Sequence, residues 1–127
     1  NRAVVHRYEV SGADAEFLSS HDAVAISGVA AAIEMGEPLA VDALGSEVYV
    51  AASFHEHLGS VVALVADPLG NVMVRVVHDD AWDLVTGASQ VADGGVRLAP
   101  RAAVALDLMA SADPRDWIAA QHLRDSP

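Results

Sequence analysis

The chain has 127 residues, of which 53% are hydrophobic and 20% charged, so it is long and apolar enough for one globular domain with a single core. Its formal net charge of −11 excludes non-specific binding to a nucleic acid backbone, because that affinity comes from basic side chains that displace counterions. Having no cysteine, the chain can form neither a disulfide framework nor a thiolate zinc site.

The first third of the chain alternates strand and helix signals. In order, it predicts a strand, a short helix, a buried strand and a second helix, over residues 3–10, 11–20, 23–26 and 29–35. Ser11 and Asp14 are typical of a helix start, and Gly36 ends the second helix. A Ser27-Gly28 break separates that helix from the strand before it, and the backbone N–H groups there could face an anion.

The middle of the chain predicts three strands, over residues 47–52, 61–66 and 72–77. A loop over 37–45 precedes them, and a short helical turn over 54–58 follows the first strand. The segment Asp67–Asn71 places Pro early and Gly-Asn late, which favours a tight turn. We therefore expect the second and third strands to pair as a hairpin.

Two helices are predicted at the end of the chain, after a turn-rich connection over 87–96 with room for a short edge strand. The only charge between Ala102 and Ala110 is Asp107, so the first of these helices is expected to be apolar nearly all round and buried on most sides. Asp113 as N-cap and Pro114 as first helical residue predict the start of the second.

The predicted fold class is α+β, with a mixed β-sheet covered by helices and a two-helix C-terminal element. We expect one domain over residues 1–127. The apolar runs are too short to span a bilayer and no signal peptide opens the sequence, so a cytoplasmic protein is expected. The chain begins at Asn1 rather than Met, inside a strand-like segment, which favours its being the C-terminal part of a longer protein.

Two groups of polar residues could hold a metal ion. His55 and His57, at positions i and i+2, can lie on one side of an extended segment, and His78, Asp79 and Asp80 follow a later strand. The alternative is a solvated polar turn at the first group and a helix start capped by Asp80 at the second. Short histidine pairs and loop acids are common in an acidic chain, so we favour the second interpretation.

Asp107 stands alone as an acid within an apolar helix. A buried carboxylate must be paired, hydrogen-bonded or protonated, and Arg75, Arg97 and Arg101 are the candidate partners. We expect a structural ion pair rather than a catalytic acid, because no second catalytic group is placed beside it. Replacing Asp107 with alanine should then cost roughly 1–3 kcal/mol of stability.

Three stretches together resemble the C-terminal domain of the AbiEi-type antitoxin and transcriptional-regulator family. Ala25–Ala32 (AISGVAAA) is similar to its apolar strand, Ser/Thr-Gly and small-residue helix, and Glu47–Val50 (EVYV) to its next strand. Val72–Val77, then Asp79-Asp80 and the run VRLAPRAAVALDLMASADPR, resemble its closing strand and its apolar helix with Asp-Leu before a second helix. Family members are bacterial proteins of type IV toxin–antitoxin systems, with a winged-helix DNA-binding domain ahead of this one.

This resemblance implies a non-enzymatic regulatory or antitoxin domain that works by protein contact, self-association or ligand sensing. Its partners would be a toxin, its own DNA-binding domain or a second copy, with no membrane and no direct contact to nucleic acid. No basic recognition helix occurs in the chain. We assign no catalytic, cofactor-binding or metal-ligating residue and no cofactor.

An enzyme remains the alternative. The Ser27-Gly28 turn and the strand after it faintly resemble a nucleotidyltransferase core, which needs two alternate carboxylates on that strand to hold Mg²⁺. Glu47 stands at the first position, but Tyr49 occupies the second and cannot act as a hard-cation ligand. The alternative is therefore a small metal-assisted enzyme using Asp79 and Asp80, or a degenerate nucleotidyltransferase-like domain.

Overall fold

The computed structural model describes residues 4–39, 46–92, 94–111 and 113–125. Its strands are β1 (Val4–Glu9), β2 (Val24–Ser27), β3 (Ser46–Ala51), β4 (Val65–Ala66), β5 (Val72–Val77), β6 (Gln90–Val91) and β7 (Arg97–Leu98). Its helices are α1 (Gly12–Ser19), α2 (Gly28–Glu34), α3 (Ala52–His55), α4 (Leu58–Val61), α5 (Asp79–Ala88), α6 (Arg101–Met109) and α7 (Pro114–Asp125).

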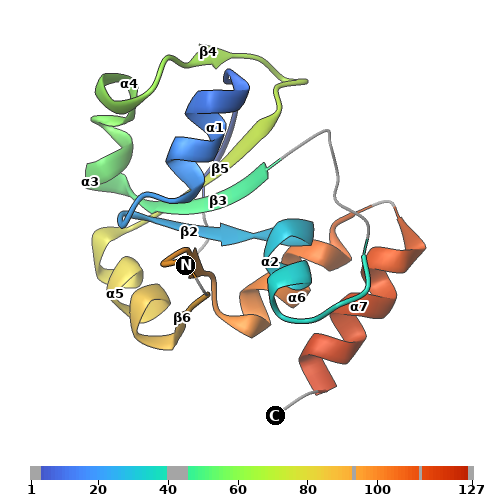
Figure 1. Cartoon of the computed structure of the whole chain (residues 1–127). Helices are drawn as coiled ribbons and strands as arrows, with labels where there is room; N and C mark the ends of the chain where they lie inside the picture. Colours follow the sequence, from blue (N-terminus) through green and yellow to red (C-terminus); the bar gives the residue numbers. More distant parts are fainter. Residues whose placement is uncertain (1–3, 40–45, 93, 112, 126–127) are drawn as a thin grey trace.

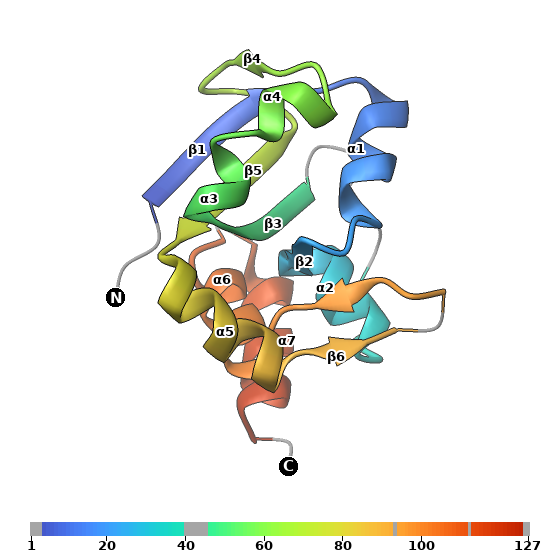
Figure 2. The same cartoon turned by 90° about the vertical axis from the view of Figure 1, so that its left-hand side faces the viewer.

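The described strands form one mixed sheet in the order β4-β1-β5-β3-β2-β7-β6. β3 is parallel to β5 and β2 is parallel to β7, whereas the other neighbours are antiparallel. Helices α1, α3 and α4 lie on one side of the sheet, and α2, α6 and α7 on the other (Figures 1 and 2). The predicted α+β class, with a mixed sheet and two C-terminal helices, is confirmed.

The two sheet faces differ in chemistry because side chains alternate along each strand. Val48 and Val50 of β3 are fully buried on the face that bears α1, α3 and α4. The same face carries Val74 of β5, the register partner of Val48. The opposite face of the central strands carries polar side chains, among them Glu47, Tyr49 and Arg75.

Local capping signals identify two helix starts correctly. Ser11 is the residue before α1 begins, and its side chain accepts a hydrogen bond from the N–H of Asp14 at 3.2 Å. Asp113 Oδ1 accepts the N–H of Arg115 at 2.9 Å, and α7 begins at Pro114 as predicted. Such contacts satisfy N–H groups that have no partner within the helix.

The predicted hairpin between residues 61–66 and 72–77 is wrong. Val61 belongs to α4, and β4 pairs with β1, which lies between β4 and β5 in the sheet. The expected turn is present, since the N–H of Gly70 donates to the carbonyl of Asp67 at 2.9 Å. The turn residues correctly predicted that the chain reverses here. However, β1, from about 60 residues earlier in the chain, pairs with β5 in place of β4.

The expectation that α6 is buried on most sides is also wrong. Val104, Ala105 and Leu108 are buried, but Leu106 is 71% and Met109 52% exposed. α6 packs on α2 and β2 with one face and on α7 with another. Apolar composition could not show that a third face stays uncovered, because an exposed leucine resembles a buried one in sequence.

The segment after β5 differs from its prediction in where the helix begins and ends. α5 starts at Asp79 with His78 at the N-cap position, so Asp80 lies inside the helix and does not cap it. The helix runs to Ala88, into the segment expected to be turns. The short edge strand predicted there exists as β6, paired with β7. Residues 40–45 of the predicted loop lie outside the described residues.

None of the described helices is long and apolar enough to cross a membrane.

Candidate functional site

Three neighbouring strands and one helix bring five polar side chains together. In the sheet register Ser27 lies opposite Glu47, and Tyr49 lies opposite Arg75, so these residues share one face. α6 crosses that face and places Asp107 over them. We call these five residues the polar centre.

Asp107 receives three donors and is the hub of the polar centre. Ser27 Oγ donates to Asp107 Oδ2, and the Tyr49 hydroxyl donates to the same oxygen at 2.9 Å. Arg75 Nε lies 3.2 Å from Asp107 Oδ1, while Arg75 Nη2 lies 2.9 Å from Glu47 Oε1. Arg75 and Asp107 have side chains only 11% and 9% exposed, so this is a largely desolvated ion pair. The predicted structural pairing of Asp107 is confirmed, and Arg75 is its partner.

Burial shapes the protonation of the two other acidic groups. Burial raises the pKa of the Glu47 carboxyl, whereas the charge of Arg75 lowers it. Burial raises the pKa of Tyr49 further, because the Asp107 charge and hydrogen bond also disfavour a phenolate there. Tyr49 therefore stays a neutral hydrogen-bond donor to Asp107 across the physiological range.

We predict that Tyr49→Phe lowers the free energy of unfolding by about 1 kcal/mol near pH 7, because Asp107 loses one donor. The raised pKa of Tyr49 also makes the wild-type chain lose stability as pH rises above the unfolded-state value of about 10, since the unfolded chain releases that proton first. Urea unfolding between neutral and alkaline pH measures both effects. The variant should show a shallower alkaline decline, and an identical decline would contradict the assignment.

The carboxylate of Glu47 lies beside the Ser27-Gly28 break. Gly28 has φ +65°, and a Cβ built on it would come within 2.2 Å of Glu47 Oε2. Glycine is therefore favoured here by the backbone conformation, and any larger residue would also have to displace the Glu47 side chain. The Glu47 carboxylate therefore lies next to the turn at which the sequence suggested that an anion could bind.

A small pocket of about 230 Å³ opens beside the polar centre. Its lining residues are Arg7, Val29, Glu47, Met73, Arg75, Asp107, Leu108, Ala110, Ser111 and Asp116. Asp116, in the first turn of α7, is only 9% exposed. Arg7 and Asp116 cannot be recognised as neighbours from the sequence, because only the fold brings β1 and α7 to the same pocket.

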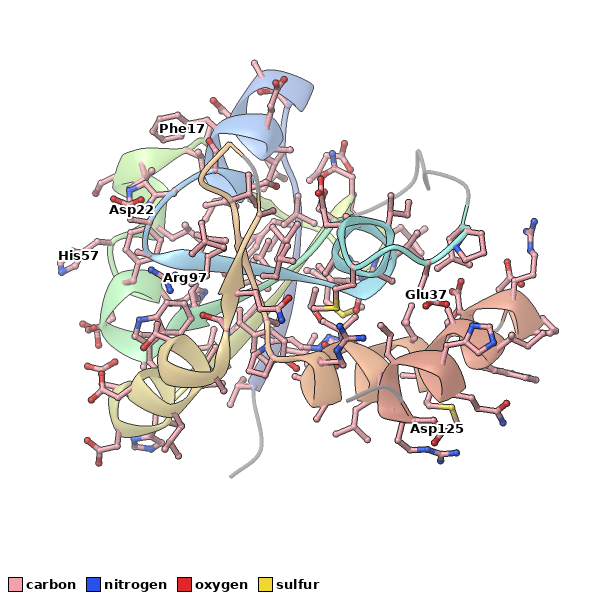
Figure 3. The ribbon with its side chains drawn as sticks, turned by 60° about the horizontal axis from the view of Figure 1, so that its bottom comes forward. Phe17, Asp22, Glu37, His57, Arg97 and Asp125 are labelled. Atoms are coloured by element: carbon pink, nitrogen blue, oxygen red, sulfur yellow. The ribbon has the colours of Figure 1, made fainter. Side chains whose placement is uncertain are left out.

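The histidines considered as metal ligands have other contacts or face solvent. His55 Nε2 is 2.8 Å from the Tyr8 hydroxyl, and its ring stacks on His6 with centroids 4.5 Å apart. Burial lowers the pKa of His55, which favours the neutral ring. His57 is exposed and points outward (Figure 3).

The acidic residues after β5 are also accounted for without an ion. Asp79 Oδ1 accepts the N–H of Ser53 at 3.0 Å, joining α5 to α3, and His78 and Asp80 are exposed. In the described part of the chain, no three His, Asp or Glu side chains gather in a way that could hold a metal ion.

A second hollow lies between the two C-terminal helices. It has a volume of about 590 Å³ and is lined by Arg101, Ala102, Ala105, Leu106, Met109, Ala120, Gln121, Leu123 and Arg124. We call it the C-terminal groove. Its surface is largely apolar, with an arginine from each helix.

The fold and the polar centre define an α+β domain in which the buried Arg75 is paired with Asp107 and Glu47. A protein-family model described as "Transcriptional regulator, AbiEi antitoxin, Type IV TA system" matches residues 4–126. The chain belongs to this family of antitoxins and transcriptional regulators, as the three quoted stretches had indicated. No significant match was found among curated proteins or among solved structures.

Proposed function

We propose that residues 1–127 are the non-enzymatic effector part of a bacterial transcriptional regulator and antitoxin. It would act by protein contact or ligand sensing, while DNA binding would reside in a winged-helix domain outside this sequence. A net charge of −11 supports this division, since it opposes contact with a phosphate backbone. Such a regulator would work in the cytoplasm.

The observation that carries the non-enzymatic assignment is the position of Arg75. A metal-assisted phosphoryl-transfer site needs free carboxylates to hold Mg²⁺. Here the guanidinium of Arg75 lies 2.9 Å from Glu47 and 3.2 Å from Asp107, so a permanent cation of the chain already pairs with both acids. Tyr49, at the alternate position of β3, donates to Asp107 as a neutral hydroxyl.

The expected result of a Mg²⁺ or Mn²⁺ titration is an unchanged melting temperature at millimolar ion. An ion that binds only the folded state raises stability by an amount that grows with its concentration. The matched control is Arg75→Met, which removes the internal cation while keeping an unbranched side chain. A rise in melting temperature of the wild-type chain that Glu47→Gln abolishes would favour the metal-assisted enzyme instead.

A further inference from the structure

The C-terminal groove exposes apolar side chains that nothing in the described part of the chain covers. On α6, Ala102, Ala105, Leu106 and Met109 follow one another at the i, i+3, i+4, i+7 spacing of a single helix face. Leu106 is 71% and Met109 52% exposed, while the small alanines beside them leave room for a close approach. A face of this kind between two packed helices is typical of a site for a third helix.

The charge of the groove is opposite to that of the chain. Among the described residues its lining contains Arg101 and Arg124 and no carboxylate, although the chain has a net charge of −11. The Arg101 side chain has no ion-pair partner in the described ranges, and Arg124 pairs there only with the exposed Asp125 beside it, at 3.4 Å. The groove therefore fits a helix that carries acidic side chains next to an apolar one.

Helix α5 of the same chain has this chemistry. Asp80, Asp83 and Leu84 are exposed and share one side of the helix, at positions i, i+3 and i+4. Leu84 is 74% exposed, and neither carboxylate has an ion-pair partner among the residues that the structure describes. Leu84 and the C-terminal groove are thus two exposed apolar features surrounded by opposite charges.

We propose that α5 of a second copy of this chain docks in the C-terminal groove. Leu84 packs on Leu106 and Met109, while the acidic side chains of α5 face Arg101 and Arg124. This inference goes beyond the proposed function, since it follows from the surface of the chain alone.

A closed dimer can contain this contact twice. In both views α5 lies in the lower part of the molecule together with α6 and α7, whereas α1 and α4 lie at the top (Figures 1 and 2). A twofold axis between α5 and the groove therefore lets α5 of each copy reach the groove of the other. Two reciprocal contacts double the buried surface, which a single helix of 10 residues would leave small for a stable dimer.

Sedimentation velocity of the whole chain, over concentrations of about 1–500 µM, tests the proposal. The wild-type chain should pass from monomer to dimer as its concentration rises. Leu84→Ser and Leu106→Ser should each weaken dimerisation by about tenfold or more. Both leucines are exposed, so these variants should fold as the wild type does. A wild-type chain that stays monomeric throughout would overturn the proposal.

Leu69→Ser is the matched control. Leu69 is 90% exposed and lies outside both α5 and the groove, so the variant removes the same side chain from a surface that the dimer does not use. It should dimerise as the wild type does. Equal weakening by Leu69→Ser and Leu84→Ser would mean that association is non-specific, against the proposal.

Mixing the two variants identifies which surfaces meet. A dimer of Leu84→Ser with Leu106→Ser keeps one contact in which both leucines are native, whereas either variant alone has a serine in each contact. The mixture should therefore dimerise more tightly than either variant alone. No gain on mixing would show that something other than α5, such as the groove of the second copy, occupies the groove.

Charge reversal gives an independent readout. Asp80→Arg should weaken dimerisation, because it brings a like charge toward the arginines of the groove. Adding Arg101→Asp in the same chain should recover part of the loss. A double variant that dimerises no better than Asp80→Arg alone would contradict the charge complementarity by which α5 was chosen.

The result is distinguishable from a failure of the proposed function. A chain that stays monomeric and is not stabilised by Mg²⁺ lacks this contact but keeps its non-enzymatic assignment. A chain that dimerises through α5 and is stabilised by Mg²⁺ through Glu47 keeps the contact and loses that assignment.

Discussion

Replacing Asp107 with alanine is expected to lower the free energy of unfolding by about 3 kcal/mol, the upper end of the range expected from sequence. The substitution removes the acceptor of Ser27 and Tyr49 and one of the two carboxylates that neutralise Arg75. Arg75 keeps Glu47, which limits the loss. Urea unfolding at neutral pH measures the change in free energy. In a thermal melt the same change should lower the melting temperature by roughly 10 °C.

Asp107→Asn and Asp83→Ala are the controls for this experiment. The asparagine keeps an acceptor but loses the charge, so its effect should lie between those of wild type and alanine. Asp83 is exposed, and its replacement should change stability by no more than about 0.5 kcal/mol. If Asp107→Ala unfolds at the wild-type urea concentration, the polar centre does not contribute to stability as described.

The second large effect is expected for Gly70→Ala. Gly70 follows the turn after β4, where the chain passes β1. A Cβ on this residue would come within 2.3 Å of the carbonyl carbon and oxygen of Tyr8 and 2.7 Å of the Glu9 nitrogen. These are backbone atoms of a paired strand and cannot move aside cheaply, so we expect a loss of about 3 kcal/mol in unfolding free energy.

Gly59→Ala is the matched control, because it adds the same methyl group where nothing lies within 4 Å. Gly59 lies in α4, and alanine there should be neutral or stabilising by up to about 1 kcal/mol. Equal stability of the two variants would mean that the chain does not pass β1 as closely as described.

Local signals were sufficient for the parts of the fold that depend on neighbouring residues. Ser11 and Asp113 identify helix starts because a short polar side chain can accept an N–H two or three residues later. The residues over 47–52 predicted a strand, and β3 is found there. Pairing partners could not be predicted in this way, since the insertion of β1 between β4 and β5 depends on residues far apart in the chain.

The same distinction holds for the candidate site. The isolation of Asp107 within apolar residues indicated a buried ion pair, since a buried charge needs a partner. Its choice of Arg75, and its contacts with Ser27 and Tyr49, depend on the register of β2, β3 and β5. Asp116 carried no such signal, because an acid in the first turn of a helix is equally well explained by the helix dipole.

The central claim is that Arg75 takes the position in which an enzyme of this shape would need a metal ion. Paramagnetic Mn²⁺, added to the ¹⁵N-labelled chain and followed by NMR, tests it most directly, because a bound ion broadens the signals of nearby amides. We expect the amide signals of Ser27, Glu47 and Asp107 to persist and to broaden no more than those of exposed residues. Selective loss of these signals at sub-stoichiometric Mn²⁺ would contradict it.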